Sequence, residues 1–124
     1  MQLTLAFSLS PAIAQKTTNL NQQKKKVTES LAMDTVLRLP EVQQADAYIR
    51  RITKGTRHLF SMLYGEPDKA HSYYWVAVGE DNGMSFVTHF GFYVYTRGGE
   101  ISYVDNVTGE VVDLKTWRRN RSKQ

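Results

Sequence analysis

The sequence of 124 residues contains no cysteine, and this absence excludes several kinds of site. Without thiols the chain has no disulfide, no thiolate zinc site, no cysteine nucleophile and no cysteine for a lipid anchor. Its three histidines, His58, His71 and His89, lack metal-binding spacings such as two histidines four residues apart on a helix. We therefore expect no metal centre.

The motifs of common enzyme chemistry are also lacking. The sequence has no glycine-rich phosphate loop, no nucleophile elbow and no catalytic-lysine motif. His89 with Glu80 or Asp81 would make an acid–base dyad. However, both carboxylates fall in a predicted hairpin turn, where acidic residues are favoured for backbone reasons. We therefore predict that the chain is not an enzyme and that it binds no cofactor.

The basic residues are concentrated at the two ends of the chain. The formal net charge is +4, yet residues 31–115 hold eight basic and eleven acidic residues. Residues 1–30 hold four lysines and one glutamate, and residues 116–124 hold four basic residues and no acidic one. Nucleic-acid binding domains carry a basic patch on their folded surface, and basic ends around an acidic body are a much weaker signal. We expect no nucleic-acid partner.

The first 14 residues, MQLTLAFSLSPAIA, combine a short apolar run with a small-x-small site at Ala12-Ile13-Ala14. This pattern is typical of a signal peptide, although no basic residue precedes the run. The run is also shorter than the ~20 apolar residues of a membrane span. We predict an export signal over 1–14, whole or truncated, a periplasmic or secreted location and no integral membrane segment. The alternative is an amphipathic or disordered N-terminus of a cytoplasmic protein.

The next segment, residues 15–39, is predicted to be a basic polar linker followed by a lead-in segment. Residues 15–30 are nearly without apolar side chains, so burial cannot offset the entropy of ordering them. The sequence LAMDTVLRL at 31–39 fits a short helix or a strand. At the other end of the chain, residues 118–124 form a basic tail.

Residues 41–54 are predicted to form one amphipathic helix. Pro40 suits the first position of a helix, and Gly55 suits its end. Four apolar residues recur at spacings of three and four, which places them on one stripe of the helix: Val42, Ala45, Ile49 and Ile52. We expect this stripe to cover the core face of a sheet.

Residues 73–114 are predicted to form a meander of four antiparallel strands. Runs rich in Tyr, Trp, Phe and Val are separated by turn signals at 79–83, 97–100 and 106–109. Residues 57–64 fit a further strand or an extension of the helix, and Gly55 favours the strand. The predicted fold class is α+β, with one main N-terminal helix packed on a curved antiparallel meander of about four strands, in a single domain over 40–117.

Alternation along residues 85–95 predicts which side chains face the helix. Phe86, Phe90, Phe92 and Val94 are in phase and should lie in the core. A single helix cannot cover both sides of the sheet, so the aromatic side chains with polar tips should lie on the other face. Such side chains are common at protein interfaces. Our candidate binding residues are therefore Tyr73, Trp75, His89, Tyr93, Tyr95 and Tyr103.

Two details of this face are left open by the sequence. The aromatic side chains have a structural alternative to binding, in which the 31–39 segment covers them or they cover a curved sheet themselves. In addition, Gly91 inside a predicted strand indicates a bulge or a sharp bend. Such a bulge would reverse part of the face assignment.

The order of one helix and then a meander, with the closing pattern FYVYTRGGEISYVDNVTGEVVDL, resembles the small cystatin-like and PepSY-type α+β domains of bacterial envelope proteins. A strand pair around a turn such as VTGEV at 107–111 is typical of those domains. The resemblance covers about residues 40–117 and includes no active-site motif. It implies a non-enzymatic module that inhibits, protects or scaffolds another protein.

The sequence therefore favours an exported protein-binding module, of inhibitor or immunity type, that acts through its aromatic face or an edge strand. An edge strand would also give a route to a homodimer. The alternative is an α+β cone that binds or hydrolyses a small molecule between helix and sheet, with His89 or Tyr93 as its polar residue. A self-associating structural protein is a third reading.

Overall fold

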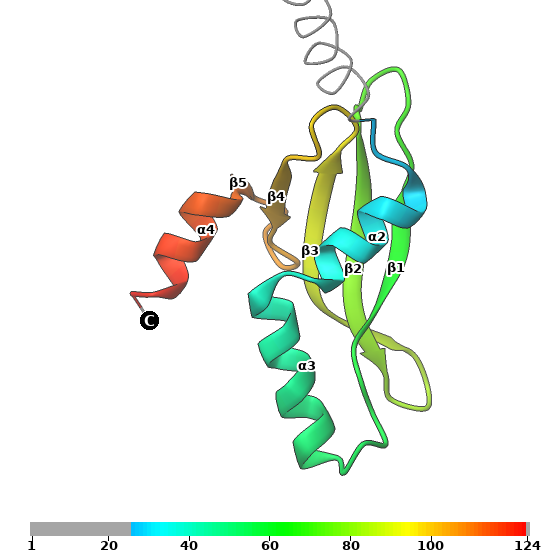
Figure 1. The fold of residues 1–124 in the computed structure, drawn as a ribbon, viewed down its shortest axis with the longest axis vertical. Helices are drawn as coiled ribbons and strands as arrows, with labels where there is room; N and C mark the ends of the chain where they lie inside the picture. The colour runs from blue at the N-terminus through cyan, green and yellow to red at the C-terminus, as the bar shows by residue number, and fades with distance from the viewer. Residues whose placement is uncertain (1–25, 124) are drawn as a thin grey trace, which may run out of the picture.

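The computed structural model describes residues 26–123. The predicted export signal and the first part of the predicted linker lie outside the described residues. The described residues form the following elements, labelled in Figure 1: α2 (Glu29–Leu37), α3 (Pro40–Ile52), β1 (Phe60–Gly65), β2 (Tyr73–Asp81), β3 (Phe86–Tyr95), β4 (Ile101–Val104), β5 (Val111–Asp113) and α4 (Leu114–Arg121).

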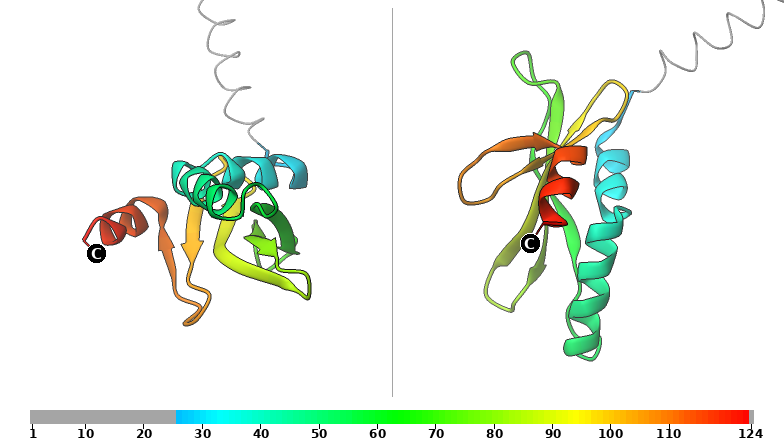
Figure 2. Two further views of the ribbon diagram at one scale, coloured as in Figure 1. Left: turned by 90° about the horizontal axis from the view of Figure 1, so that it is seen from below. Right: turned by 90° about the vertical axis from the view of Figure 1, so that its left-hand side faces the viewer.

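The α+β class is confirmed, whereas the layout differs in part from the prediction. Within residues 26–123, two helices precede the sheet instead of one, a fifth strand is present, and α4 follows β5. The strands form one antiparallel meander in the order β1-β2-β3-β4-β5, so residues 57–64 contribute a strand, as Gly55 favoured. Figure 2 shows α2 and α3 together on one side of this sheet.

The segment left open by the sequence, residues 31–39, is mostly helix α2. The Leu31 N–H donates to Thr28 Oγ1 at 3.2 Å, which satisfies one of the free N–H groups at the start of the helix. Ala32 and Val36 are fully buried and belong to the core, where α2 lies against β1 and β2. This segment therefore covers the core face of the sheet and not its aromatic face, and the packed region begins before residue 40.

Helix α3 starts at Pro40, as predicted, and only part of its apolar stripe is buried. Val42 and Ile49 are buried, whereas Ile52 is 58% exposed. The prediction for Ile52 is wrong because α2, and not α3, supplies the main helical cover of the sheet. Asp46 on α3 accepts a hydrogen bond from the Leu59 N–H at 2.7 Å, which holds the entry to β1 against the helix.

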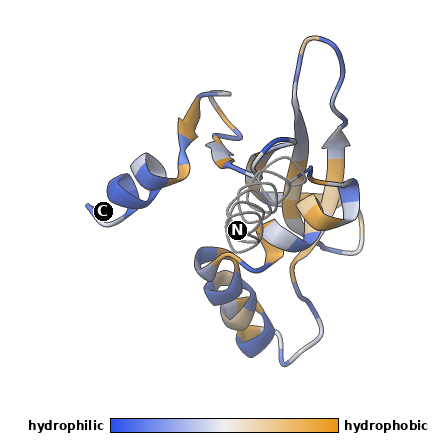
Figure 3. Cartoon of the chain, turned by 45° about the horizontal axis from the view of Figure 1, so that its top comes forward, coloured by the Kyte–Doolittle hydropathy of each residue, from blue (hydrophilic) through white to orange (hydrophobic). Residues whose placement is uncertain are grey.

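The core of the sheet contains three of the four residues predicted for it on β3 and is closed at one end by Trp117. Phe90, Phe92 and Val94 are buried with Val76 and Val78 of β2. Figure 3 shows α4 as largely hydrophilic, yet its Trp117 is buried and lies edge-on to Phe92, with ring centroids 5.6 Å apart. Trp117 therefore anchors α4 to the core.

One extra residue in β3 changes the alternation below this core. Val78 pairs with Phe90 while the next residue, Gly79, pairs with Thr88, so His89 has no partner on β2 and forms a bulge. The prediction for Phe86 is wrong for this reason. Its ring leaves the core side and lies edge-on to Phe60, with centroids 5.1 Å apart. The bulge lies at His89 and not at Gly91.

Gly79 is required by this bulge, and we predict that Gly79→Ala destabilises the fold by about 3 kcal/mol, since the backbone cannot move away cheaply. A Cβ added there would lie 2.0 Å from the Val87 carbonyl oxygen. The control is Gly65→Ala, where the added Cβ would make an ordinary 3.5 Å contact with Trp75. Urea unfolding should separate the two variants, and equal losses would contradict the assigned crowding.

The two isoleucines of α3 test which part of its stripe is packed. Ile49→Asp should cost about 3 kcal/mol or more because it places a charge in the core. Ile52→Asp, one turn later on an exposed position, should change the free energy of unfolding by less than about 1 kcal/mol. Thermal unfolding followed by circular dichroism gives both values. A larger loss for Ile52→Asp than for Ile49→Asp would overturn the orientation of α3.

Candidate functional site

Four of the predicted residues form one aromatic cluster on the sheet face opposite α2. The strand register sets Tyr73 opposite Tyr95 and Trp75 opposite Tyr93. The Tyr73 and Tyr93 rings are stacked with centroids 3.8 Å apart. Tyr95 lies edge-on to Tyr73 at 5.6 Å, and Trp75 lies edge-on to Tyr93 at 6.0 Å. These contacts hold the four rings in fixed relative orientations.

A fifth member of the cluster, Tyr64 of β1, was missed by the sequence analysis. Its ring lies edge-on to Trp75 with centroids 5.7 Å apart, and its hydroxyl is 3.0 Å from Thr88 Oγ1. The register between β1 and β2 shifts between Leu63 and Gly65, so Tyr64 occupies an irregular position. The sequence left residues 57–64 open between a strand and a helix, so the alternation of side chains could not assign Tyr64 to a face of the sheet.

The aromatic cluster, defined as Tyr64, Tyr73, Trp75, Tyr93 and Tyr95, is partly open to solvent. Trp75 is 38% exposed, and none of the helices in residues 26–123 lies over this face of the sheet (Figure 2). Large aromatic side chains that stay accessible while their neighbours fix them are typical of binding surfaces. The alternative in which residues 31–39 cover this face is wrong, because α2 lies on the other side.

Tyr103 and His89 do not join the cluster, which corrects two predicted positions. Tyr103 pairs with Phe92 across β3 and β4, so it lies on the core side, where it stacks on Trp117 with centroids 4.7 Å apart. Burial is the main cause that raises the pKa of Tyr103, and the nearby Asp105 carboxylate adds to it. His89 turns away from the cluster because it is the bulged residue of β3.

A hollow of about 520 Å³ adjoins the aromatic cluster. One wall is formed by Tyr64, Trp75, Thr88 and Tyr93, and the other by residues 104–109 of the β4–β5 hairpin. Asp105 shapes that hairpin, because its Oδ1 accepts from the backbone N–H groups of Val107 at 2.8 Å and Thr108 at 2.9 Å. The same hydrogen bonds lower the pKa of Asp105, so its carboxylate stays ionised at neutral pH.

The ionisation of Tyr73 indicates what the cluster can do chemically. Burial, followed by the hydroxyl of Tyr93, raises the pKa of Tyr73 to about 12. A phenol with that pKa remains protonated at neutral pH and is therefore a hydrogen-bond donor. The cluster therefore presents rigid rings with hydroxyl and indole N–H groups, which suits binding.

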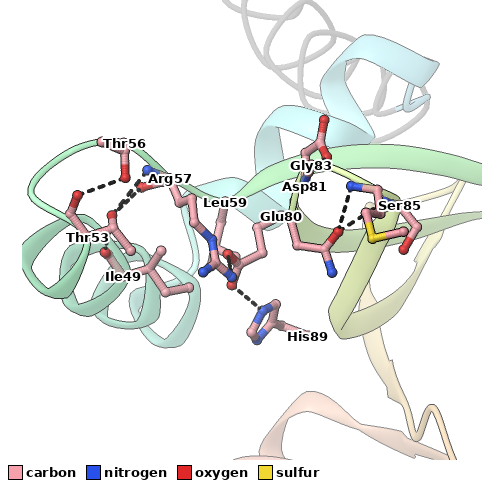
Figure 4. Close-up of polar contacts among 12 residues, drawn as sticks. Ile49, Thr53, Thr56, Arg57, Leu59, Glu80, Asp81, Gly83, Ser85 and His89 are labelled. Carbon is pink, nitrogen blue, oxygen red and sulfur yellow. Dashed lines mark hydrogen bonds and ion pairs between the residues drawn. The ribbon is translucent and has the colours of Figure 1, made fainter.

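A second group of polar side chains lies on the helix side of the sheet, where Arg57, Glu80 and His89 meet (Figure 4). Glu80 is only 3% exposed. Its Oε2 is 2.7 Å from His89 Nε2, and its Oε1 has the Arg57 guanidinium as its only close polar neighbour among the described residues. The structure therefore brings together one of the two dyads that the sequence allowed, Glu80 with His89.

The other dyad does not form, and both acidic residues end β2 instead of lying in the turn. Asp81 accepts a hydrogen bond from the Gly83 N–H at 2.8 Å, which stabilises the hairpin that follows. Glu80 is already in contact with two basic side chains, from the loop after α3 and from β3. This arrangement indicates a clamp between the α3–β1 loop and the β2–β3 hairpin. Across residues 26–123 no three His, Asp or Glu side chains gather closely enough to hold a metal ion.

Comparisons with protein-family models, with curated proteins and with solved structures found no match to this chain. None of the helices in residues 26–123 has the length and apolar character that crossing a bilayer requires. The arguments about function therefore rest on the geometry of the aromatic cluster and of the Glu80 clamp.

The Glu80 clamp predicts a stability difference between two neighbouring carboxylates. Glu80→Gln should destabilise the fold by about 1–2 kcal/mol, less than for a fully buried ion pair because Arg57 and His89 are partly solvated. Asp81→Asn, which keeps an acceptor for the Gly83 N–H, should cost less than about 0.5 kcal/mol. Urea unfolding of both variants measures the difference. Equal losses would show that Glu80 does not clamp the two segments.

Proposed function

We propose that this chain is a non-enzymatic protein-binding module that binds another protein through its aromatic cluster. One observation carries the proposal. Five interlocked aromatic side chains, with a hollow of about 520 Å³ beside them, lie on the sheet face that no described helix covers.

The physical case is that these rings can bind at low entropic cost. Each ring is held by an edge-on or stacked neighbour, so little side-chain freedom is lost when a partner covers the cluster. Buried Trp and Tyr side chains at the centre of an interface commonly contribute about 2 kcal/mol or more each when truncated. The indole N–H of Trp75, which is 38% exposed, can donate a hydrogen bond to a backbone carbonyl of a partner.

The rival reading, a small-molecule site between helix and sheet, receives less support. Four side chains between α2 and the sheet, Val36, Val76, Val78 and Phe92, pack without exposed surface. A hollow of about 380 Å³ beside them is lined by Leu31, Thr35 and Val94 among others, and neither residue nominated for a small-molecule site lines it. Of its two nominated residues, Tyr93 belongs to the aromatic cluster on the other face and His89 is hydrogen-bonded to Glu80. Export and an inhibitor or immunity role remain part of our proposal, and export rests on the sequence of residues 1–14 alone.

The test compares partner recovery by three forms of the tagged full chain, purified from its own host and analysed by quantitative mass spectrometry. The wild type should recover one protein in near-stoichiometric amount. Trp75→Ala should reduce that recovery at least tenfold, since a loss of about 2 kcal/mol is a factor of about 30 in affinity. The matched control, Tyr48→Ala, removes an exposed aromatic ring from α3 and should recover the partner as the wild type does.

Two outcomes would overturn the proposal. In the first, Trp75→Ala retains the partner in wild-type amount. In the second, no protein is recovered and a small molecule copurifies, which favours the rival reading. Circular dichroism of the variants verifies that a lost partner does not reflect a lost fold.

A further inference from the structure

The sheet has two edges, and they differ in length. β5 is three residues long and continues directly into α4. β1 is six residues long and pairs with β2 on one side, while none of residues 26–123 pairs with its outer side. Because alternate residues of an antiparallel strand direct their N–H and C=O groups to each side, the outer side of β1 presents backbone donors and acceptors that have no partner within residues 26–123.

The sequence of β1, FSMLYG, carries none of the side chains that natural proteins place on such an edge. It contains no lysine, no proline and no charged residue, although these residues commonly prevent edge-to-edge pairing. The irregularity at Tyr64 is its only protective feature, and it lies at the end of the strand. β1 is therefore open to pairing with another strand.

The side chains of β1 are complementary to a second copy of themselves. In an antiparallel strand pair, directly opposed residues lie on the same face of the sheet. Two copies related by a two-fold axis therefore present the same face on the same side only if one residue lies opposite its own copy at the axis. Placing the axis at Met62 pairs the whole of residues 60–64. It sets Phe60 opposite Tyr64 of the second copy, twice, and Met62 opposite itself. Aromatic cross-strand pairs of this kind are among the favourable ones in antiparallel sheets.

We propose that a second copy of this chain pairs with β1 through its own β1, antiparallel and centred on Met62. The resulting sheet has ten strands, and the two aromatic clusters lie on the same face of it. A single strand pair makes only a few backbone hydrogen bonds and a small interface, so the dimer is weak and depends on concentration. This inference does not depend on the proposed function, since it concerns the edge and not the face.

The first test is the mass of the full chain in solution between about 1 and 500 μM, a range chosen for an interface of this size. Sedimentation should show the 14.2 kDa chain shifting toward twice that mass as concentration rises. Met62→Lys, at a 37% exposed position of β1, should abolish the shift. Val111→Lys, at a 41% exposed position on the opposite edge, should leave it unchanged. A wild type that stays monomeric, or equal effects of both lysines, overturns the proposal.

The second test uses the absence of cysteine to read the register. Met62→Cys places one thiol per copy at the two-fold axis, where directly opposed Cβ atoms are about 5 Å apart, near the reach of a disulfide. Under mild oxidation it should form a covalent dimer at least tenfold faster than Val111→Cys or Ser61→Cys. In the proposed register Ser61 faces Leu63 and not its own copy. Equal rates for all three variants overturn the register, and partner recovery in the Trp75 experiment remains a separate result.

Discussion

The rest of the structure depends on one packing constraint, the contact between the Gly79 backbone and the Val87 carbonyl at the bulge of β3. Only a glycine fits there, since a Cβ would lie 2.0 Å from that oxygen. His89 is the extra residue of the bulge and has no partner on β2. The alternation of side chains between the two faces therefore reverses at this point of β3. On one side of it Phe90, Phe92 and Val94 enter the core. On the other side Phe86 turns to the aromatic face.

The same irregularity produces both polar arrangements described above. It brings the imidazole of His89 within 2.7 Å of Glu80, which leaves the buried carboxylate with two basic neighbours. It also places Thr88 on the aromatic face, where its hydroxyl meets that of Tyr64. A regular strand would bury Phe86 and Thr88 and would direct His89 toward the tyrosines. The separation of clamp and aromatic cluster is therefore a consequence of one extra residue.

The sequence predicted those features that local physics determines and missed those set by distant contacts. Pro40 and Gly55 bound a helix by their own backbone restrictions, and period-two alternation placed Phe90, Phe92 and Val94 correctly. The bulge depends on crowding between two strands, which no local pattern reports. The predicted face of Tyr103 was wrong because the turn before β4 determines which side chains of that strand face the core. Residues 31–39 form a helix because their apolar side chains have a sheet to cover, and a short apolar run alone fits either state.

Tyr64 belongs both to the aromatic face of the sheet and to its β1 edge. It belongs to the aromatic cluster through its edge-on contact with Trp75, and it belongs to the open edge because it lies on β1. Pairing of two β1 strands would add Phe60 of one copy beside Tyr64 of the other, so the aromatic clusters would become parts of one wider face. A partner large enough to span both clusters would then bind the dimer more tightly than the monomer, and its binding would stabilise the strand pair by the same free energy.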